Sequence, residues 1–420
     1  MSRMLDVYLH TDLVGHLVQD DDGDMSFQYA ESWVTAPRAI ALSHSLPLRN
    51  ERFRRKECRG YFGGILPEQT QRETIARNLG ISARNDYAML ERIGGECAGA
   101  VTFLPQGTLL PEPQYGYRDL TNEELVAILK ELPRRPLLAG EQGIRLSLAG
   151  AQDKLAVRIE GGMIRLPLGG APSTHILKPN VERFEDVVFD EAFCMQLAAA
   201  AGLSAAPVEI RKVDDLDFLL IERYDRHHHA PAEGASVVER LHQEDFCQAL
   251  GIVSEHKYQR EGGPSLKQCF ALLRDVSSAP VIDLARLLDA IIFNYLVGNN
   301  DAHGKNFSLV YRPGPDDLEI RLSPLYDVVS TVYYPELSPE MAMRIGGEYS
   351  SEKVGLKDFE QMAADAGLGK PIVRARLVET TERVMTVLPS VPTPNHVSKE
   401  VANLIRQRCE TAMNRFRRRP

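Results

Sequence analysis

The sequence predicts a mixed α+β protein, on two observations. Short apolar segments that alternate with glycine and proline turns dominate as far as about residue 226. Apolar residues at helical spacing dominate from about residue 240 onward. A chain of 420 residues also has room for two or three domains, each with its own core. We therefore expect the strand-rich domains first and a mostly helical domain last.

The first hundred residues predict a small α+β domain. Strands are expected at residues 4–9, 15–18, 25–29 and 101–104, and helices at about 69–78 and 86–93. Residues 105–120 hold three prolines and several turn residues, so they are expected to form a linker. A helix then begins at Thr121, whose side chain can cap it while Glu124 reaches back.

The next hundred residues predict strands with one helix among them. Strands at 155–159 and 174–179 precede a helix at about 189–201, and strands at 208–211 and 218–221 follow it. Phe189, Phe193 and Leu197 share one face of that helix, and Gly202 is its stop. This order of elements is typical of the smaller lobe of a kinase.

Composition excludes several classes of protein. No apolar run reaches the length of a membrane span, and the first residues lack the apolar core of a signal peptide. Six cysteines without CxxC spacing argue against a zinc site and indicate reduced thiols in a cytoplasm. The net charge of −9 does not favour broad nucleic-acid binding, and the basic runs at 52–56 and 415–419 are expected to be solvated.

An amphipathic helix pattern at 284–296 leads directly into the polar segment NNDAHGKNFS at 299–308. Asp301 is followed five residues later by Asn306, and Asp327 comes after a predicted hairpin. A kinase catalytic loop and its metal aspartate have this order. A carboxylate can deprotonate an attacking hydroxyl, and amide and carboxylate oxygens suit Mg²⁺. Taken alone, Asp-x-x-x-x-Asn also fits a capped turn.

Lys178 is a candidate phosphate ligand, because it lies on an apolar strand where an unpaired charge would be costly. Glu191, on the next helix, is its candidate partner. An edge strand with Lys178 in water is the alternative.

The segment 147–154 is a candidate phosphate loop. Gly150 between two alanines lets the backbone approach an anion, and Lys154 adds positive charge. A tight turn between strands would have the same sequence. Glu222, Arg223 and Tyr224 leave a strand where a kinase hinge would bind adenine through backbone groups.

Several motifs in one order make the chain resemble the HipA family of bacterial toxin serine/threonine kinases. They are SLAGAQDK at 147–154, HILK at 175–178, ERYD at 222–225, DAHGKNFS at 301–308 and LYD at 325–327. The segments LPL at 46–48, GGILP at 63–67 and GGECAGA at 94–100 extend the resemblance over nearly the whole chain. It implies a two-lobed protein-kinase-like fold with an extra N-terminal α+β subdomain at 1–108, a small lobe at 109–226 and a helical large lobe at 227–420.

The resemblance also implies roles for individual residues. Asp301 would be the catalytic base, with Asn306 and Asp327 as Mg²⁺ ligands. The following would line the ATP site: Ala149, Gly150, Ala151, Gln152, Asp153, Lys154, Lys178, Glu222, Arg223, Tyr224, His303, Gly304, Lys305, Asn306, Tyr326 and Asp327. Ser147 matches a serine that family members autophosphorylate, which ejects the loop and switches the kinase off. The two asparagines before Asp301 are expected to vary without consequence.

The family also suggests partners. Its toxins are neutralised by HipB, a helix-turn-helix antitoxin that binds operator DNA, so a HipB-like antitoxin and, through it, operator DNA are expected. Some members phosphorylate an aminoacyl-tRNA synthetase, halting translation and promoting persistence, so a translation component is the expected substrate. A small-molecule kinase and a non-enzymatic corepressor remain alternatives. Ser147 in the nucleotide loop favours the protein kinase.

Overall fold

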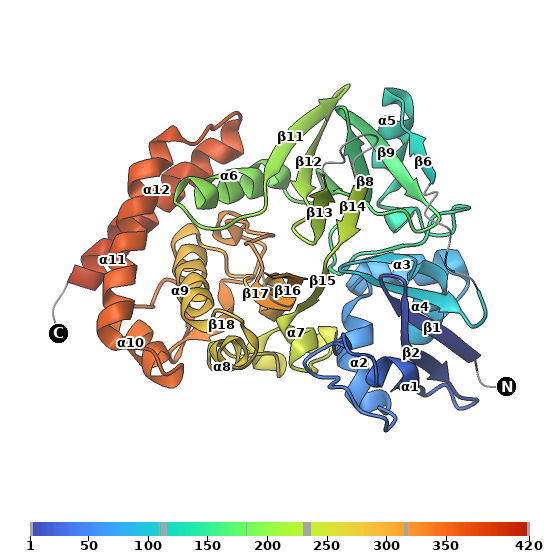
Figure 1. Cartoon of the computed structure of the whole chain (residues 1–420). Helices are drawn as coiled ribbons and strands as arrows, with labels where there is room; N and C mark the ends of the chain where they lie inside the picture. The colour runs from blue at the N-terminus through green and yellow to red at the C-terminus, as the bar shows by residue number, and fades with distance from the viewer. Residues whose placement is uncertain are drawn as a thin grey trace. The chain divides into compact units, whose positions relative to one another are not determined.

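The computed structural model describes residues 3–108, 110, 116–181, 183–229, 237–314 and 318–417. Helices and sheets are both present, so the predicted α+β class is confirmed. The chain forms two compact units, whose elements are labelled in Figure 1. The first unit comprises Met1–Pro179, Lys212–Glu255 and Val310–Arg312, and the second comprises Asn180–Arg211, His256–Leu309 and Pro313–Pro420. The predicted domain boundaries after residues 108 and 226 stay predictions.

The first unit begins with a small antiparallel sheet and its helices. The strands lie in the order β3-β2-β1-β5, with β1 at Arg3–Leu9, β2 at Asp12–Gln19, β3 at Met25–Tyr29 and β5 at Val101–Pro105. The helices are α1 (Glu31–Val34), α2 (Arg55–Gly64), α3 (Gln69–Leu79) and α4 (Asp86–Ile93). The strands and helices predicted for this region are confirmed.

Helix α2 is not predicted by the sequence pattern, because it holds Gly60, Gly63 and Gly64, and glycine disfavours helices. Packing explains two of these glycines. A Cβ atom at Gly60 would lie 2.5 Å from the backbone of Gly251, and one at Gly64 would lie 2.5 Å from the Gln248 side chain. Close tertiary packing therefore overrides the helix propensity here.

A second sheet of the first unit carries the predicted nucleotide lysine. Its strands include, in order, β12 (Leu216–Glu222), β10 (His175–Pro179), β8 (Leu155–Glu160), β9 (Met163–Leu168) and β6 (Gly116–Asp119). Strand β6 corrects the prediction of a linker at 105–120, of which residues 109 and 111–115 lie outside the described residues. Helix α5 (Asn122–Glu131) begins with the expected capping box of Thr121 and Glu124.

Shorter elements complete the first unit. They are β4 (Glu96–Cys97), η1 (Pro136–Leu138), β7 (Leu146–Ser147), β13 (Arg226–His229), β14 (Val237–Arg240), β15 (His242–Asp245) and α7 (Phe246–Ala249). Strands β4 and β7 pair in parallel, which brings Cys97 opposite Ser147.

The second unit is mostly helical. Its helices are α6 (Val187–Ala200), α8 (Leu266–Val276), α9 (Pro280–Val297), α10 (Leu356–Asp365), α11 (Lys370–Val387) and α12 (His396–Arg417), with short turns η3 (Gln259–Glu261), η4 (Gly304–Asn306), η5 (Thr331–Tyr333) and η6 (Leu388–Ser390). Helix α9 packs against α8, α11 and α12 (Figure 1). The predicted helices at 189–201 and 284–296 are confirmed, as is the expectation of a mostly helical final part.

The strands of this part of the chain are short. They are β17 (Leu318–Leu322), β18 (Glu340–Ile345) and β19 (Glu348–Ser350). Three elements include residues of both units. They are the strands β11 (Val208–Val213) and β16 (Ser308–Pro313) and the turn η2 (Ser254–His256). Among the described residues, no helix is both long enough and apolar enough to cross a bilayer.

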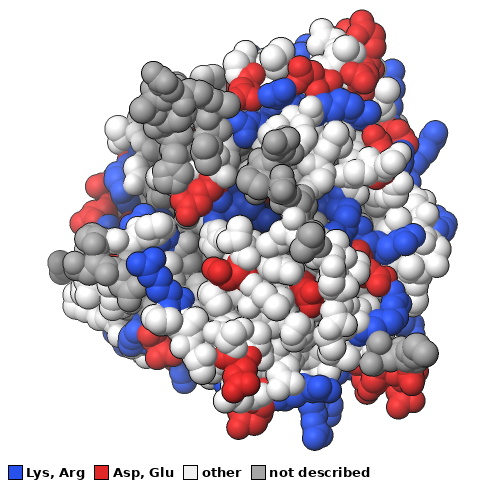
Figure 2. All heavy atoms as spheres, turned by 45° about the vertical axis from the view of Figure 1, so that its right-hand side comes forward, with Lys and Arg blue, Asp and Glu red and all other residues white. Residues whose placement is uncertain are grey.

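Surface charge is mixed where it can be seen. On the face drawn in Figure 2, Lys and Arg side chains are interspersed with Asp and Glu side chains. Residues 418–420 of the basic tail lie outside the described residues. On the face shown, this distribution gives no electrostatic support for broad nucleic-acid binding.

A buried charge network lies inside the first unit. Glu96 accepts hydrogen bonds from Arg226 and, at 3.1 Å, from Nη1 of Arg223. Asp225 accepts from Nε of Arg223 at 2.9 Å and from the backbone N–H of Gly99 at 2.6 Å. The four charged side chains belong to residues that are 0–6% exposed. Burial alone would raise the pKa of Glu96, but Arg223 and Arg226 outweigh it and the pKa is lowered. The network therefore joins the β4 segment to the residues that follow β12.

Replacing Glu96 by alanine should strongly destabilise the first unit. The change leaves two buried guanidinium groups without one of their carboxylates, which typically costs about 3–5 kcal/mol. Urea unfolding followed by the fluorescence of Trp33, the single tryptophan, measures this loss. As a control, Asp24→Ala removes an exposed pair with Arg55 and should cost less than about 1 kcal/mol. Equal, small losses in the two variants would contradict the role given to the network.

Candidate active site

The polar segment begins where helix α9 ends. Gly298 caps the helix with a φ of +76°, and its N–H bonds the carbonyl of Tyr295 at 3.3 Å. A Cβ atom at this position would lie 2.3 Å from Val332. Positive φ and lack of space both require glycine, so this residue sets the direction in which the chain leaves the helix.

Two asparagines position Asp301 through a chain of hydrogen bonds. Nδ2 of Asn294 donates to the carbonyl of Ala290 at 2.9 Å, and Nδ2 of Asn299 donates to Oδ1 of Asn294 at 2.8 Å. Oδ1 of Asn299 then accepts from the backbone N–H of Asp301 at 3.1 Å. Sequence analysis treated Asn299 as free to vary, whereas its amide links helix α9 to residues 299–308, the candidate catalytic segment.

Asn300 ties the same segment to the residues beyond Asp327. Its N–H donates to Oγ1 of Thr331 at 2.7 Å, and its carbonyl accepts from the N–H of Ala342 at 2.7 Å. Its side-chain amide donates to the carbonyl of Pro339 at 3.0 Å. Asn300 therefore joins its own segment to Thr331 and to residues 339–342.

Asp301, Asn306 and Asp327 lie near one another, while their roles as base and metal ligands stay predictions. Nδ2 of Asn306 lies 3.4 Å from the carbonyl of Asp301 and 3.5 Å from the carbonyl of Asp327. Asp327 has a φ of +58°, a conformation that few non-glycine residues adopt and that is frequent at functional sites. The arrangement offers carboxylate and amide oxygens, which are the donors that Mg²⁺ prefers.

The remaining predicted residues of this loop lie beside these three. His303 is 5% exposed, and its Nε2 is 4.0 Å from Oδ2 of Asp301. The hydroxyl of Tyr326 lies 2.7 Å from both the carbonyl of Lys305 and Oγ of Ser308. Tyr326, next to Asp327 in the chain, thus holds η4 in place.

A buried carboxyl on helix α6 holds the segment after Asp327. Oδ1 of Asp190 accepts from the N–H of Ser330 at 3.1 Å and from Sγ of Cys194 at 3.2 Å. Asp190 is fully buried, and burial raises its pKa from 3.8 to about 7. Sequence analysis missed this residue, because an aspartate inside an apolar helix gives no local sign of its partner.

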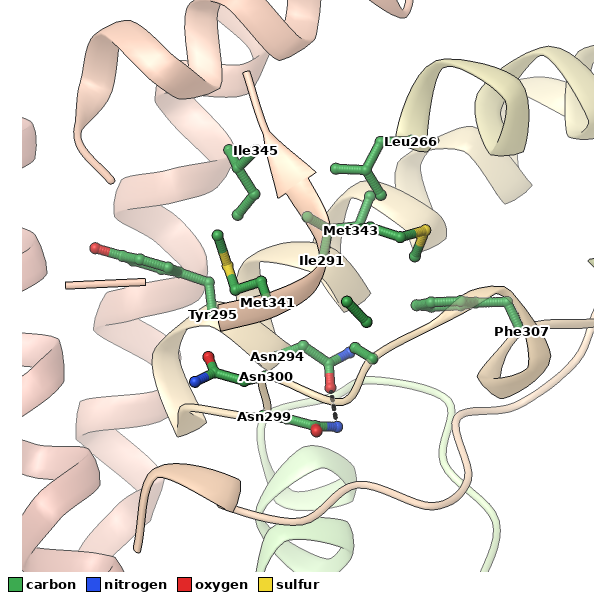
Figure 3. A pocket seen from close by; sticks show the side chains of 12 residues that line it. Leu266, Ile291, Asn294, Tyr295, Asn299, Asn300, Phe307, Met341, Met343 and Ile345 are labelled. Carbon is green, nitrogen blue, oxygen red and sulfur yellow. Dashed lines mark hydrogen bonds between the residues drawn. The ribbon is translucent and has the colours of Figure 1, made fainter. Parts of the chain in front are cut away.

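Two small cavities lie beside the candidate catalytic segment. A cavity of about 30 Å³ is lined by Ile291, Phe307 and Met343 on its apolar side and by the asparagine amides on the other. Figure 3 shows these side chains and the bond from Asn299 to Asn294. Phe307 also lines a second cavity, of about 60 Å³. Beside these cavities, hydrogen bonds from Asn299 to Asn294 and from Asn300 to Thr331 hold the segment.

In the first unit, the candidate phosphate loop packs on residues 65–71. The hydroxyl of Ser147 is fully buried and donates to the carbonyl of Ile65 at 3.0 Å. The carbonyl of Gly150 accepts from the N–H of Glu68 at 3.1 Å. Gly150 has a φ of +104°, so its glycine identity is needed.

The charged side chains of this loop are also held. Nζ of Lys154 donates to the carbonyl of Ala149 at 2.5 Å, and Asp153 accepts from Gln71. Burial raises the pKa of Asp153. The loop that sequence analysis assigned to phosphate binding is therefore closed on itself and on helix α3.

Lys178 is 4% exposed and pairs with Leu219 across β10 and β12. It is therefore not on a solvated edge. Glu191, its predicted partner, is fully buried and belongs to the second unit, so their pairing stays a prediction.

The side chains of the predicted hinge, residues 222–224, make contacts within the first unit. The guanidinium of Arg223 lies in the buried charge network, and the backbone N–H of Arg223 donates to the carbonyl of Thr174 at 3.0 Å. Glu222 pairs with His175, and the hydroxyl of Tyr224 donates to Gln243 at 2.7 Å. Adenine binding at this segment stays a prediction.

The fold and the catalytic segment together define a protein of the protein-kinase-like class. Residues 146–388 match the family of the HipA-like C-terminal domain, and residues 5–104 match the HipA N-terminal domain. The chain therefore belongs to the HipA family, and the predicted two-lobed kinase-like fold with an added N-terminal subdomain is confirmed.

Similar proteins agree with this assignment. A Sinorhizobium fredii protein named "Putative kinase Y4mE" is 48% identical over 92% of each chain. The serine/threonine-protein kinase toxin HipA of Shewanella oneidensis is 29% identical, over 92% of this chain and 89% of its own. HipA in a solved complex of the Shewanella oneidensis toxin–antitoxin system with HipB and operator DNA superposes with a TM-score of 0.84, at 27% identity over 98% of each chain.

Asp190 should make stability depend on pH. Its carboxyl holds a proton in the folded state up to a pH of about 7, whereas the unfolded chain releases that proton near pH 4. Stability contributed by this group therefore falls as pH rises between these values, by at most about 1.4 kcal/mol per unit. Unfolding of the wild type and of Asp190→Asn, followed by circular dichroism from pH 4.5 to 8, measures the difference. Parallel curves across this range would contradict the raised pKa.

Proposed function

We propose that this chain is an Mg-ATP-dependent serine/threonine protein kinase and the toxin of a HipA/HipB-like pair. The observation that carries the proposal is that the side chain of Asn306 lies beside the backbone carbonyls of both Asp301 and Asp327. Relatives that span nearly the whole chain are named as kinases, which agrees with it.

In the proposed reaction, the oxygen of a serine or threonine hydroxyl forms a bond to the γ-phosphorus of ATP. The bond from that phosphorus to the β–γ bridging oxygen breaks, ADP leaves, and Asp301 takes the hydroxyl proton. Mg²⁺, when bound, supplies positive charge at the transferring phosphoryl group. Asn306 and Asp327 would hold the ion, whose other ligands would come from phosphates and water.

The residues of the first unit would bind the nucleotide. Lys178 and Lys154 bring positive charge, and the backbone of residues 149–153 would face the phosphates once the loop opens from residues 65–71. Gly150, at positive φ, permits the sharp turn that this backbone needs.

Ser147 would be the autophosphorylation site that switches the kinase off. Its hydroxyl is fully buried against the carbonyl of Ile65, where a dianionic phosphate would be costly to bury and would meet a carbonyl oxygen. Modification would therefore keep the loop out of this position and remove Lys154 from the nucleotide.

The partners and substrate follow from the family assignment. The solved Shewanella oneidensis complex contains HipB and operator DNA, so we propose a HipB-like antitoxin, with DNA contacted mainly through it. The proposed protein substrate is a translation component such as an aminoacyl-tRNA synthetase. Phosphoproteomics after brief expression, compared with Asp301→Ala, identifies it. Turnover of small alcohols without labelled protein would instead show a small-molecule kinase.

Two aspartate variants separate the proposed roles in catalysis and in metal binding. With labelled ATP, Asp301→Ala should lose at least about 100-fold in phosphoryl transfer while still binding Mg-ATP, because only the base is removed. Asp327→Ala should lose Mg²⁺-dependent ATP binding itself, measured by calorimetry. Unchanged transfer in the first variant, or unchanged binding in the second, would contradict the assigned role.

Ser147→Ala should prevent self-labelling without abolishing ATP binding. Alanine fits the buried position and loses one hydrogen bond, worth about 1 kcal/mol, so the loop should stay folded. Label on the chain is measured by mass spectrometry, with Ser45→Ala as a control hydroxyl in the same unit. Label that persists on the Ser147→Ala chain would refute the assigned site.

A further inference from the structure

A tyrosine outside the predicted site contacts the predicted catalytic base. The hydroxyl of Tyr258 donates to Oδ1 of Asp301 at 2.9 Å, and both residues belong to the second unit. The side chain of Asp301 is half exposed, and an exposed aspartate ordinarily samples several rotamers. A hydrogen bond from a fixed donor would select one of them.

The backbone of Tyr258 is firmly held. Its carbonyl accepts hydrogen bonds from the N–H groups of Glu261 and Gly263, both at 2.9 Å. The N–H of Arg344, on β18, donates to Oε1 of Gln259 at 3.0 Å and so ties η3 to a strand. A Cβ atom at Gly263 would lie 2.5 Å from the carbonyl oxygen of His256, so the turn packs closely on the residues just before Tyr258.

The ring of Tyr258 is held as well. It meets the ring of His303 edge to face, with 5.6 Å between centroids and an angle of 76°. Nζ of Lys257 lies 5.4 Å from the centre of the Tyr258 ring, within the range of a cation–π contact. Backbone and ring contacts together aim the hydroxyl at Asp301.

We propose that Tyr258 is a positioning residue, which holds Oδ1 of Asp301 and leaves Oδ2 to accept the proton of the substrate hydroxyl. Oδ2 lies on the side of His303, whose Nε2 is 4.0 Å away. The inference rests on the proposed kinase function and deepens it. It assigns different tasks to the two carboxylate oxygens, with the acceptor serine or threonine approaching the second one.

Tyr258→Phe tests the inference, because it removes the hydroxyl and keeps the ring. We expect kcat for phosphoryl transfer to fall about 10-fold, while the KM for ATP stays unchanged, since Asp301 does not bind the nucleotide. The double variant Tyr258→Phe/Asp301→Ala should be no slower than Asp301→Ala alone, because the tyrosine acts through the aspartate. Tyr349→Phe is the matched control, since Tyr349 stacks on Arg260 of η3 and should keep full activity.

Two outcomes would overturn the positioning role while leaving the kinase proposal intact. One is an unchanged kcat in Tyr258→Phe when Asp301→Ala is inactive. The other is a further loss of activity in the double variant beyond that of Asp301→Ala. If the wild type transfers no phosphate, the kinase proposal fails. Crystal structures then test whether Tyr258 positions the Asp301 carboxylate. The Asp301 carboxylate should then be ordered in the wild type and spread over rotamers in Tyr258→Phe, and one shared rotamer would overturn the positioning role.

Discussion

The segment that carries Asp301 leaves the end of a buried helix, where each freed polar group needs a hydrogen-bond partner. An unpaired buried group costs about 1–3 kcal/mol, so a few such groups could consume most of the stability of a domain. At the end of α9, Arg408 donates to the carbonyls of Tyr295 and Leu296, while Ser330 and Thr331 donate to the carbonyls of Val297 and Gly298. The amides of Asn294 and Asn299 continue this set of bonds to the N–H of Asp301. These bonds fix the backbone that presents the carboxylate of Asp301, the proposed catalytic base. The hydrogen bonds that satisfy buried polar groups at this end of the helix therefore also position the proposed catalytic base.

The two candidate loops are held in different ways. The catalytic segment is bonded to α9, to Thr331 and to Ala342, all within the second unit, and it lies over cavities. The phosphate loop of the first unit is held by the carbonyls of Ile65 and Ala149 and by the N–H of Glu68. The first arrangement suits a rigid catalytic group. The second joins the loop to residues 65–68 and to itself, and these bonds would have to break if the loop opens for a nucleotide, as proposed.

The sequence predicted most helices, strands and candidate site residues, but it did not predict the residues that hold the candidate site in place. Periodicity located α9, and the spacing of acidic and amide residues located Asp301, because both signals are local in the chain. Helix α2 was missed, since its glycines are explained only by Gly251 and Gln248, far along the chain. Asp190 and Tyr258 were missed for a related reason. Each acts on a residue distant in sequence, so that nothing nearby distinguishes a supporting aspartate or tyrosine from an ordinary one.

The position of Glu96 bears on how this chain can be divided. The residue lies within the N-terminal family match at 5–104, whereas the arginines that it neutralises lie within the C-terminal match at 146–388. A fragment that began after the first match would contain two positive charges in an apolar interior with only Asp225 opposite them. The part matched at 146–388 is therefore expected to lose stability without the N-terminal match, and an exchange of N-terminal subdomains should preserve stability best where a carboxylate is kept at position 96.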